Sequence, residues 1–154
     1  MPHTSPQLAR RVLSVMLLLG LACLGCKGNA TPKGPEGQNN LAAIAKIIDS
    51  FLIPHHGQGP KDEAELKSFV DSNGKTILDQ FKITDVASIY KSPRDGKPYV
   101  LLVGKDYDKY QTDEGSVIAY EQTGVEGVRL VVFRGGEVKE IPEAVFKTMI
   151  PNHK

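Results

Sequence analysis

The distribution of apolar and polar residues divides the 154-residue chain into successive parts. Residues 12–25, VLSVMLLLGLACLG, form an uncharged apolar run directly behind Arg10 and Arg11. Residues 26–40 are polar and rich in Gly, Pro and Asn. Further on, apolar positions recur first with helical spacing and, beyond residue 86, with the spacing of β-strands. The pattern therefore predicts a leader over 1–25, a flexible tether over 26–40 and a single folded domain over 41–154.

Helices are predicted in the first part of the domain. Apolar residues recur at intervals of three or four in LAAIAKIIDSFLI, at Leu41, Ile44, Ile48 and Leu52. Asn39 or Asn40 can cap this helix, and Pro54 ends it. In KDEAELKSFVDSNG the acidic residues come first, as a helix N-terminus favours, and Gly74 can close the helix. KTILDQFKI adds one or two further turns.

Strands are predicted in the second part of the domain, at 99–104, 116–122, 128–134 and 137–141. SPRDGKP precedes the first strand as a turn, and Gly135-Gly136 is a hairpin signal before the last one. Pro142 suits the first position of a short final helix, PEAVFKTMI. The predicted fold is α+β, with N-terminal helices packed on a four-stranded antiparallel meander and a short C-terminal helix.

The apolar run is too short to span a bilayer, which takes about 18–20 apolar residues. Its length and the basic pair before it are typical of a signal peptide. Three processing schemes compete. Cleavage before Cys26, with Gly25 at the preceding position, gives a lipoprotein; cleavage before Cys23 gives another; and cleavage after Ala30 gives an unlipidated secreted protein. Cys26 is preferred, because it leaves the longer apolar run behind it and polar chain follows at once.

A lipidated Cys26 predicts a protein held on the extracytoplasmic side of a bacterial cell membrane, inner or outer. Two or three acyl chains such as palmitate anchor a protein stably, at about 0.8 kcal/mol per buried methylene group. Cys23 would leave with the leader, so the mature chain would have no free thiol, no disulfide and no cysteine metal site.

The charge of the chain is balanced. Of its 19 Lys and Arg residues, Arg10 and Arg11 lie in the leader, which leaves 17 basic against 18 acidic residues in 26–154. This balance gives no basic bias toward nucleic acid. The expected partners are therefore the membrane and a protein of the cell envelope.

Two stretches resemble a group of secreted planctomycete proteins with pilin-like architecture. NLAAIAKIIDSFLIPHHGQGPKDEAELKSFV is similar to their opening helix and HG loop, and VVFRGGEVKEI is similar to their F-A-D-G-x-V hairpin, with Gly135 at the Asp position. SPRDGKPYVLL resembles the D-P-W-G-x-P-Y segment of type II secretion pseudopilins. The resemblance covers about half of residues 26–154. It implies a pilin-like globular fold.

The leader departs from that resemblance. Pilins carry a processing site with Gly before Phe and a Glu five residues into a long apolar helix, and this chain has neither. The resemblance therefore does not imply polymerisation through a shared N-terminal helix.

One acidic loop is a candidate calcium site. GKDYDKYQTDEG, residues 104–115, holds Asp106, Asp108, Asp113 and Glu114, and clustered carboxylates can supply several of the oxygen ligands that Ca²⁺ needs. The loop lacks the Gly and Glu of an EF-hand, so a solvated polar loop is the simpler interpretation. Pseudopilins are known for calcium in a comparable late loop, and the resemblance implies the same here. Tyr107 and Tyr110 could make the loop a contact surface.

Catalytic signatures are lacking in the sequence. G-x-S-x-G, H-E-x-x-H, Walker A and G-x-G-x-x-G do not occur. A hydrolase would have to combine Ser92 with His55 or His56, and a metal role for the two histidines would need further ligands. The sequence thus predicts a binding or scaffold module that is not an enzyme and holds no resident cofactor. The alternatives are an accessory of a secretion or pilus-like machine with calcium at 104–115, or a weak hydrolase.

Overall fold

The computed structural model describes residues 37–151, which lie within one compact unit, Pro32–Lys154. The predictions for the leader, for most of the tether and for lipidation at Cys26 or Cys23 fall outside the described residues. The described elements are, in chain order, α1 (Gln38–Leu52), α2 (Glu63–Asn73), α3 (Lys75–Gln80), the 3-10 helix η1 (Val86–Tyr90), β1 (Tyr99–Leu101), the 3-10 helix η2 (Gly104–Asp106), β2 (Gln111–Thr112), β3 (Gly115–Glu121), β4 (Val128–Phe133), β5 (Val138–Pro142) and α4 (Glu143–Met149).

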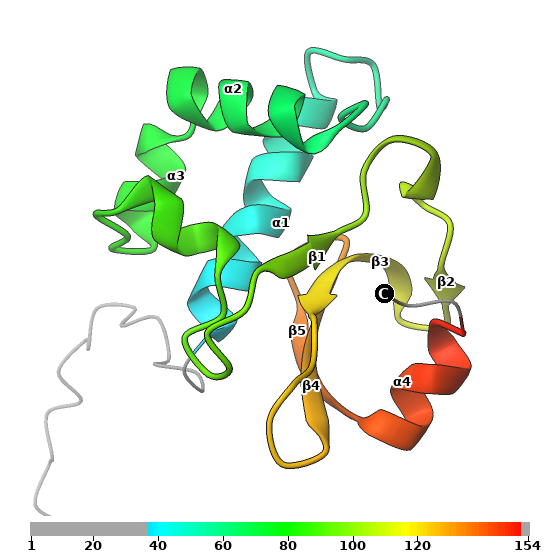
Figure 1. The fold of residues 1–154 in the computed structure, drawn as a ribbon. Helices are drawn as coiled ribbons and strands as arrows, with labels where there is room; N and C mark the ends of the chain where they lie inside the picture. Colours follow the sequence, from blue (N-terminus) through cyan, green and yellow to red (C-terminus); the bar gives the residue numbers. More distant parts are fainter. Residues whose placement is uncertain (1–36, 152–154) are drawn as a thin grey trace, which may run out of the picture. The chain divides into compact units, whose positions relative to one another are not determined.

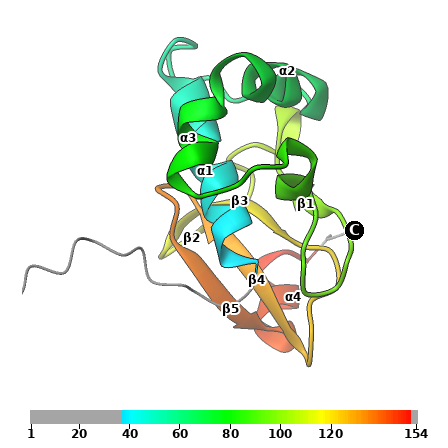
Figure 2. The ribbon, with the colours of Figure 1, turned by 90° about the vertical axis from the view of Figure 1, so that its left-hand side faces the viewer.

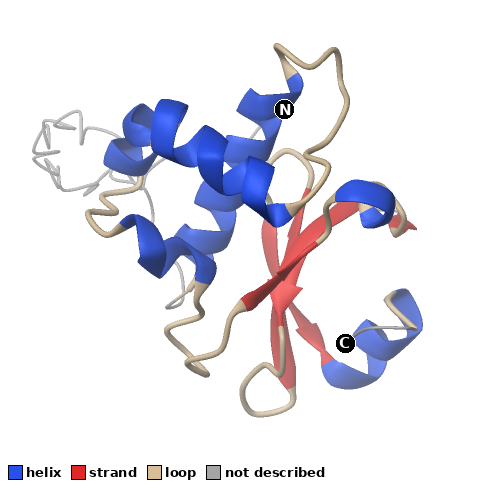
Figure 3. Cartoon of the chain, turned by 45° about the horizontal axis from the view of Figure 1, so that its top comes forward, coloured by secondary structure: helices blue, strands red, loops and turns tan. Residues whose placement is uncertain are grey.

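The predicted α+β class is confirmed, and the four predicted strands form one antiparallel sheet in the order β1-β3-β4-β5. A fifth strand, β2, was not predicted; its two residues pair with the beginning of β3. Helices α1, α2 and α3 lie on one side of the sheet and α4 lies on the other (Figures 1 and 3). Figure 2 looks from the helical side and shows α1 in front of β3 and β4, which it contacts.

Each face of the sheet has its own apolar core. On the α1 side, α1, α2 and α3 cover Ile118, Leu130 and Val132, whereas α4 covers Val131 and Phe133 on the opposite side. Strand β4 alternates between the two cores, as a strand buried on both faces must. In β3 the register shifts between Val117 and Ala119, so that Ile118 and Ala119 both face the α1 side.

The beginning of α1 differs from the prediction. Gly37 occupies the N-cap position with φ 99°, and the helix starts at Gln38, so residues 38–40 belong to the domain and not to the tether. Neither predicted asparagine caps it. The Asn40 side chain instead donates to the carbonyl oxygens of Ser88, at 2.9 Å, and Lys91, at 3.3 Å. Asn40 therefore joins α1 to the segment that precedes β1.

The second helix begins as predicted at an acidic cluster. Asp62 caps α2 by accepting a hydrogen bond from the Glu65 amide at 2.8 Å. Strand β1 is shorter than predicted, because Gly104 adopts φ 61° and turns the chain into η2. Within residues 37–151, none of the helices has the length and apolar composition that crossing a membrane would require.

Arg129 fastens α4 to the sheet. Its guanidinium group donates to both carboxylate oxygens of Glu143, at 2.6 and 2.9 Å, and to the carbonyl oxygen of Gln122 at 2.6 Å. It also lies 4.3 Å from the centre of the Phe146 ring, within the range of a cation–π contact. The Arg129 side chain is only 7% exposed, so these contacts replace water almost completely.

Candidate binding groove

Strand β1 lies at the edge of the sheet, and among the described strands it pairs only with β3. The Leu102 amide donates to the Ile118 carbonyl oxygen at 2.9 Å. Hydrogen-bonded positions alternate along an antiparallel strand, so the N–H and C=O of Leu101 point away from β3. The edge therefore presents a main-chain donor and acceptor at Leu101.

Both ends of this edge are closed. A β-bridge joins Lys91 to Pro98 at its beginning. At its other end the Gly104 amide donates to the Pro60 carbonyl oxygen at 2.7 Å. A Cβ atom on Gly104 would come within 2.5 Å of the Lys61 carbonyl oxygen, so this close approach requires glycine. The open stretch of edge runs from about Tyr99 to Val103, or about 13 Å at 3.3 Å per residue.

Two adjoining cavities lie along the open edge, and we call them together the edge groove. The first has a volume of about 460 Å³ and the second of about 430 Å³, both within the range of ligand pockets. They share Glu63, Pro98, Tyr99 and Leu101. The first is further lined by Val100, Leu102, Lys105, Asp106, Lys109, Tyr110, Tyr120 and Gln122, and the second by Lys67, Ala87, Tyr90, Lys91 and Gly96.

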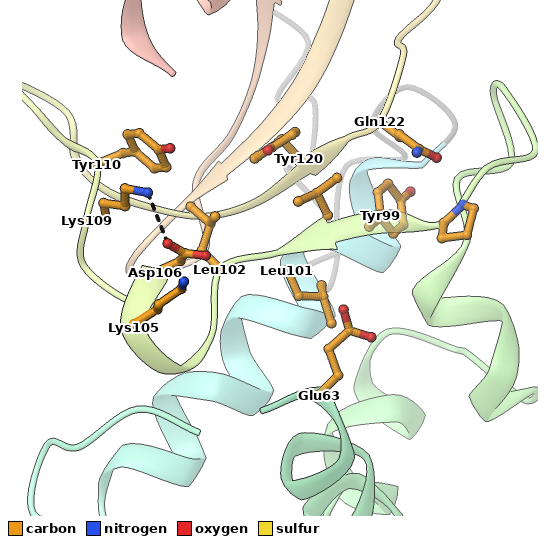
Figure 4. Close-up of a pocket in the computed structure, with 12 residues that line it drawn as sticks. Glu63, Tyr99, Leu101, Leu102, Lys105, Asp106, Lys109, Tyr110, Tyr120 and Gln122 are labelled. Carbon is orange, nitrogen blue, oxygen red and sulfur yellow. Dashed lines mark hydrogen bonds and ion pairs between the residues drawn. The ribbon is translucent and has the colours of Figure 1, made fainter. Parts of the chain in front are cut away.

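The first cavity spans the edge and reaches the α4 side of the strand. Leu102 and Tyr120 belong to the core on that side, with Val100 and Tyr110 packed against it. In Figure 4, Lys105, Asp106, Lys109 and Tyr110 gather at one end of the cavity and Gln122 lies at the other end, with Glu63 reaching toward Leu101 from the start of α2. The walls thus come from the β1 edge, the loop after it and the start of α2.

The second cavity opens on the α1 side, where Tyr90 is its aromatic wall. The Tyr90 hydroxyl is buried and has no hydrogen-bond partner among the described residues. Burial, together with the carboxylates of Asp71 and Glu63, raises the pKa of Tyr90 to about 12. The phenol therefore stays protonated at physiological pH.

The groove carries an excess of positive charge. Four lysines line it against two carboxylates. Lys67 lies 3.7 Å from Glu63, and Lys109 lies 3.1 Å from Asp106, so these pairs compensate each other. Lys91 and Lys105 form no ion pair within residues 37–151. The uncompensated charges therefore lie in different cavities, Lys91 in the second and Lys105 in the first.

The four acidic residues predicted to hold calcium are not brought together. Asp106 pairs with Lys109, Asp108 lies 3.5 Å from Arg134, and Glu114 lies 2.8 Å from Lys139. Asp113 is exposed. In the part of the chain that the structure describes, no three His, Cys, Asp or Glu residues form a group that could hold a metal ion. Calcium binding at this loop stays a prediction, and it would have to displace these lysines and Arg134.

The predicted hydrolase residues lie at opposite ends of α1. Ser92 follows Lys91, whose carbonyl oxygen contacts Asn40 in the first turn of the helix. His55 lies just beyond the last turn, where its ring stacks on Phe51 and its Nδ1 lies 2.7 Å from the Phe51 carbonyl oxygen. A helix of 15 residues is about 22 Å long, so Ser92 is far outside hydrogen-bond reach of His55 and of its neighbour His56.

Ser92 has a structural partner that the sequence did not indicate. Its hydroxyl donates to Glu121 at 2.7 Å, and the other oxygen of this fully buried carboxylate accepts from the Leu130 amide at 2.9 Å. Arg94 lies 3.6 Å from Glu121 and 3.4 Å from Glu140, so this residue of the predicted turn joins the cluster. The cluster holds the turn before β1, and with it one end of the groove.

Asp95 also stabilises the turn before β1. Partial burial raises the pKa of the Asp95 carboxyl, but hydrogen bonds from the Lys97 amide and the Thr123 hydroxyl outweigh burial and leave this pKa below its usual value. The Asp95 carboxylate thus ties the turn to the segment between β3 and β4.

Neither a protein-family model, nor a curated protein, nor a solved structure was found to match this chain. The resemblance to pilin-like planctomycete proteins stays a prediction.

Proposed function

We propose that this protein is a lipid-anchored extracytoplasmic binding module without catalytic activity of its own, and that the edge groove is its binding site. The observation that carries the proposal is the groove itself. It combines, among the described residues, a main-chain edge at Leu101 without a pairing strand, aromatic walls and two lysines without ion pairs. Ligand sites typically combine apolar walls with a few polar groups in this way.

The anchor is supported by the sequence. An apolar run of signal-peptide length ends near Cys26, and a polar segment rich in Gly and Pro follows. Such a segment would let a folded domain move at some distance from the bilayer. Cys23 remains the alternative lipidation site.

The proposed lack of catalytic activity is supported by the positions of the candidate catalytic residues. The Ser92 hydroxyl is committed to the buried Glu121, and His55 lies beyond the far end of α1. General-base catalysis needs a base within about 3 Å of the proton it removes, or one water away.

The anchor and the binding site are tested on the full chain expressed in a lipoprotein-competent host. Mass spectrometry of the mature N-terminus should find an acylated Cys26. An intact leader, or an unmodified N-terminus directly after Ala30, would reject the proposed lipid anchor. For the groove, a photo-crosslinking amino acid replaces the exposed Lys105, and the matched control replaces the exposed Lys75 on α3. Adducts in the cell envelope should form from position 105 and not from 75. Equal labelling from both positions would reject the groove as the site.

A second candidate function is an accessory role in a secretion or pilus-like machine, with calcium steadying the loop at 104–115. The α1 helix on an antiparallel meander agrees with the pilin-like architecture that the resemblance implies.

Thermal melting with calcium and with a chelator tests that candidate. A ligand at a hundredfold excess over its Kd stabilises a protein by about 2.7 kcal/mol, which would raise Tm by several degrees. We expect no such rise, because three of the four candidate carboxylates already pair with lysine or arginine side chains. A rise in Tm with Ca²⁺ that Mg²⁺ does not reproduce would favour the accessory function.

A further inference from the structure

We propose that the edge groove takes an acidic, extended peptide segment, which adds to β1 as a short extra strand. This inference rests on the proposed function, since it names the class of ligand that the binding site would take.

The first argument is the main-chain edge. Leu101 offers an N–H donor and a C=O acceptor that point away from β3, and no described strand pairs with them. An extended peptide supplies the complementary acceptor and donor in the same geometry, which is the basis of strand addition in peptide recognition.

The second argument is the position of the two cavities. The first extends to the α4 side of β1, against Val100 and Tyr120, and the second lies on the α1 side, against Tyr90; the two meet at the edge, where they share Tyr99 and Leu101. Successive side chains of a strand point to opposite faces of its sheet. A strand added at this edge would therefore direct alternate side chains into the α4-side part of the first cavity and into the second cavity.

The length of the open edge limits the number of peptide residues that can pair with β1. The Lys91–Pro98 bridge and the contact between Pro60 and Gly104 close its two ends. About three or four residues can pair between them at 3.3 Å per residue. A chain terminus or a short extended loop of a partner fits this length, and a long edge strand does not.

The third argument is charge. Lys91 and Lys105 lie in different cavities without ion pairs among the described residues, whereas the two carboxylates of the groove are paired with its other lysines. Acidic side chains on the peptide would complement both lysines.

The test uses the purified full chain and synthetic peptides of about eight residues, with a Val-Thr-Val core flanked by Glu, by Lys or by Ser. Binding is measured by titration calorimetry. The Glu-flanked peptide should bind about tenfold more tightly than the Lys-flanked one. Methylation of one central peptide nitrogen, which removes a main-chain donor, should weaken binding about tenfold. The Leu101 amide should exchange its hydrogen more slowly in the complex.

Protein variants test the charge argument. Lys105→Glu should weaken binding of the Glu-flanked peptide about three- to tenfold and improve that of the Lys-flanked one. The control Lys75→Glu makes the same charge reversal outside the groove and should leave both affinities unchanged. Equal binding of the methylated and unmethylated peptides, or unchanged exchange at Leu101, would overturn strand addition.

Failure of this inference is distinguishable from failure of the proposed function. If no peptide binds while the crosslinker at position 105 still forms envelope adducts, the inference of a peptide ligand is wrong, and the proposed binding function remains supported. If neither occurs, both are wrong. A reversible dimer in sedimentation experiments that Lys105→Glu disrupts would show that a second copy of the chain occupies the edge, and would also overturn the peptide.

Discussion

Replacing Arg129 by alanine is expected to lower the free energy of unfolding by about 3–5 kcal/mol, the usual cost of removing one partner of a buried ion pair. The change removes both hydrogen bonds to Glu143 and the donor to the Gln122 carbonyl oxygen. It also leaves the face of the Phe146 ring without its guanidinium neighbour. We expect α4 to loosen first, because the lost contacts add to the apolar packing that holds this helix against β4.

Urea unfolding followed by far-UV circular dichroism measures this effect, and a thermal melt should show Tm lowered by roughly 10–20 °C. The matched control is Lys147→Ala, which removes a second and exposed partner of the same Glu143 at 3.6 Å. Exposed pairs contribute about 0–1 kcal/mol, so the control should remain close to the parent protein. Similar losses in the two variants would mean that burial of Arg129 is not what matters.

Replacing Glu121 by alanine is expected to destabilise the domain by a comparable amount, about 3–5 kcal/mol. The fully buried carboxylate accepts from the Ser92 hydroxyl and the Leu130 amide and lies beside Arg94. Its removal leaves a buried hydroxyl and a buried amide without their acceptor, and each such group costs free energy. It also removes one of the two carboxylates beside the largely buried Arg94.

Two comparisons make the Glu121 prediction specific. Glu121→Gln keeps an acceptor oxygen of similar shape but loses the charge beside Arg94, so its loss should be smaller, about 1–2 kcal/mol. Glu140→Ala removes the half-exposed partner of the same arginine at 3.4 Å and should cost less than about 1 kcal/mol. A Glu121→Ala variant as stable as the parent would contradict the role of this carboxylate in holding the turn.

Much of the fold follows from the sequence because each pattern is local. The apolar spacing from Leu41 onward specifies α1, and the nearly continuous apolar run at 128–133 specifies a strand buried on both faces. Turn residues mark the boundaries correctly at Pro54 and at Gly135-Gly136, where both glycines have φ near 90°. The predicted cap of α1 was wrong, because the N-cap position lies between Leu130 and Tyr99, where Gly37 fits and an asparagine does not.

The groove could not be predicted in the same way, because its position depends on which strand forms the edge of the sheet. Tyr90, Leu101 and Lys105 lie on three different elements, and only the tertiary fold brings them to one surface. Glu121 shows the same limit: a glutamate near the end of a predicted strand resembles a solvated residue until the packing of the 92–94 turn is known. The acidic residues of 104–115 cluster in sequence, but their ion pairs draw three of them toward different partners.

The junction at Gly37 has a mechanical consequence. The Tyr99 hydroxyl donates to the Gly37 carbonyl oxygen at 3.2 Å, so the point where the chain enters the domain is fastened directly to β1. Tension applied through the residues before Gly37 would load this bond and pull on the same strand that borders the groove. Force on the residues before Gly37 and binding of a ligand in the groove would then be coupled through Tyr99. The affinity for the ligand would therefore differ between a molecule under tension and one without tension.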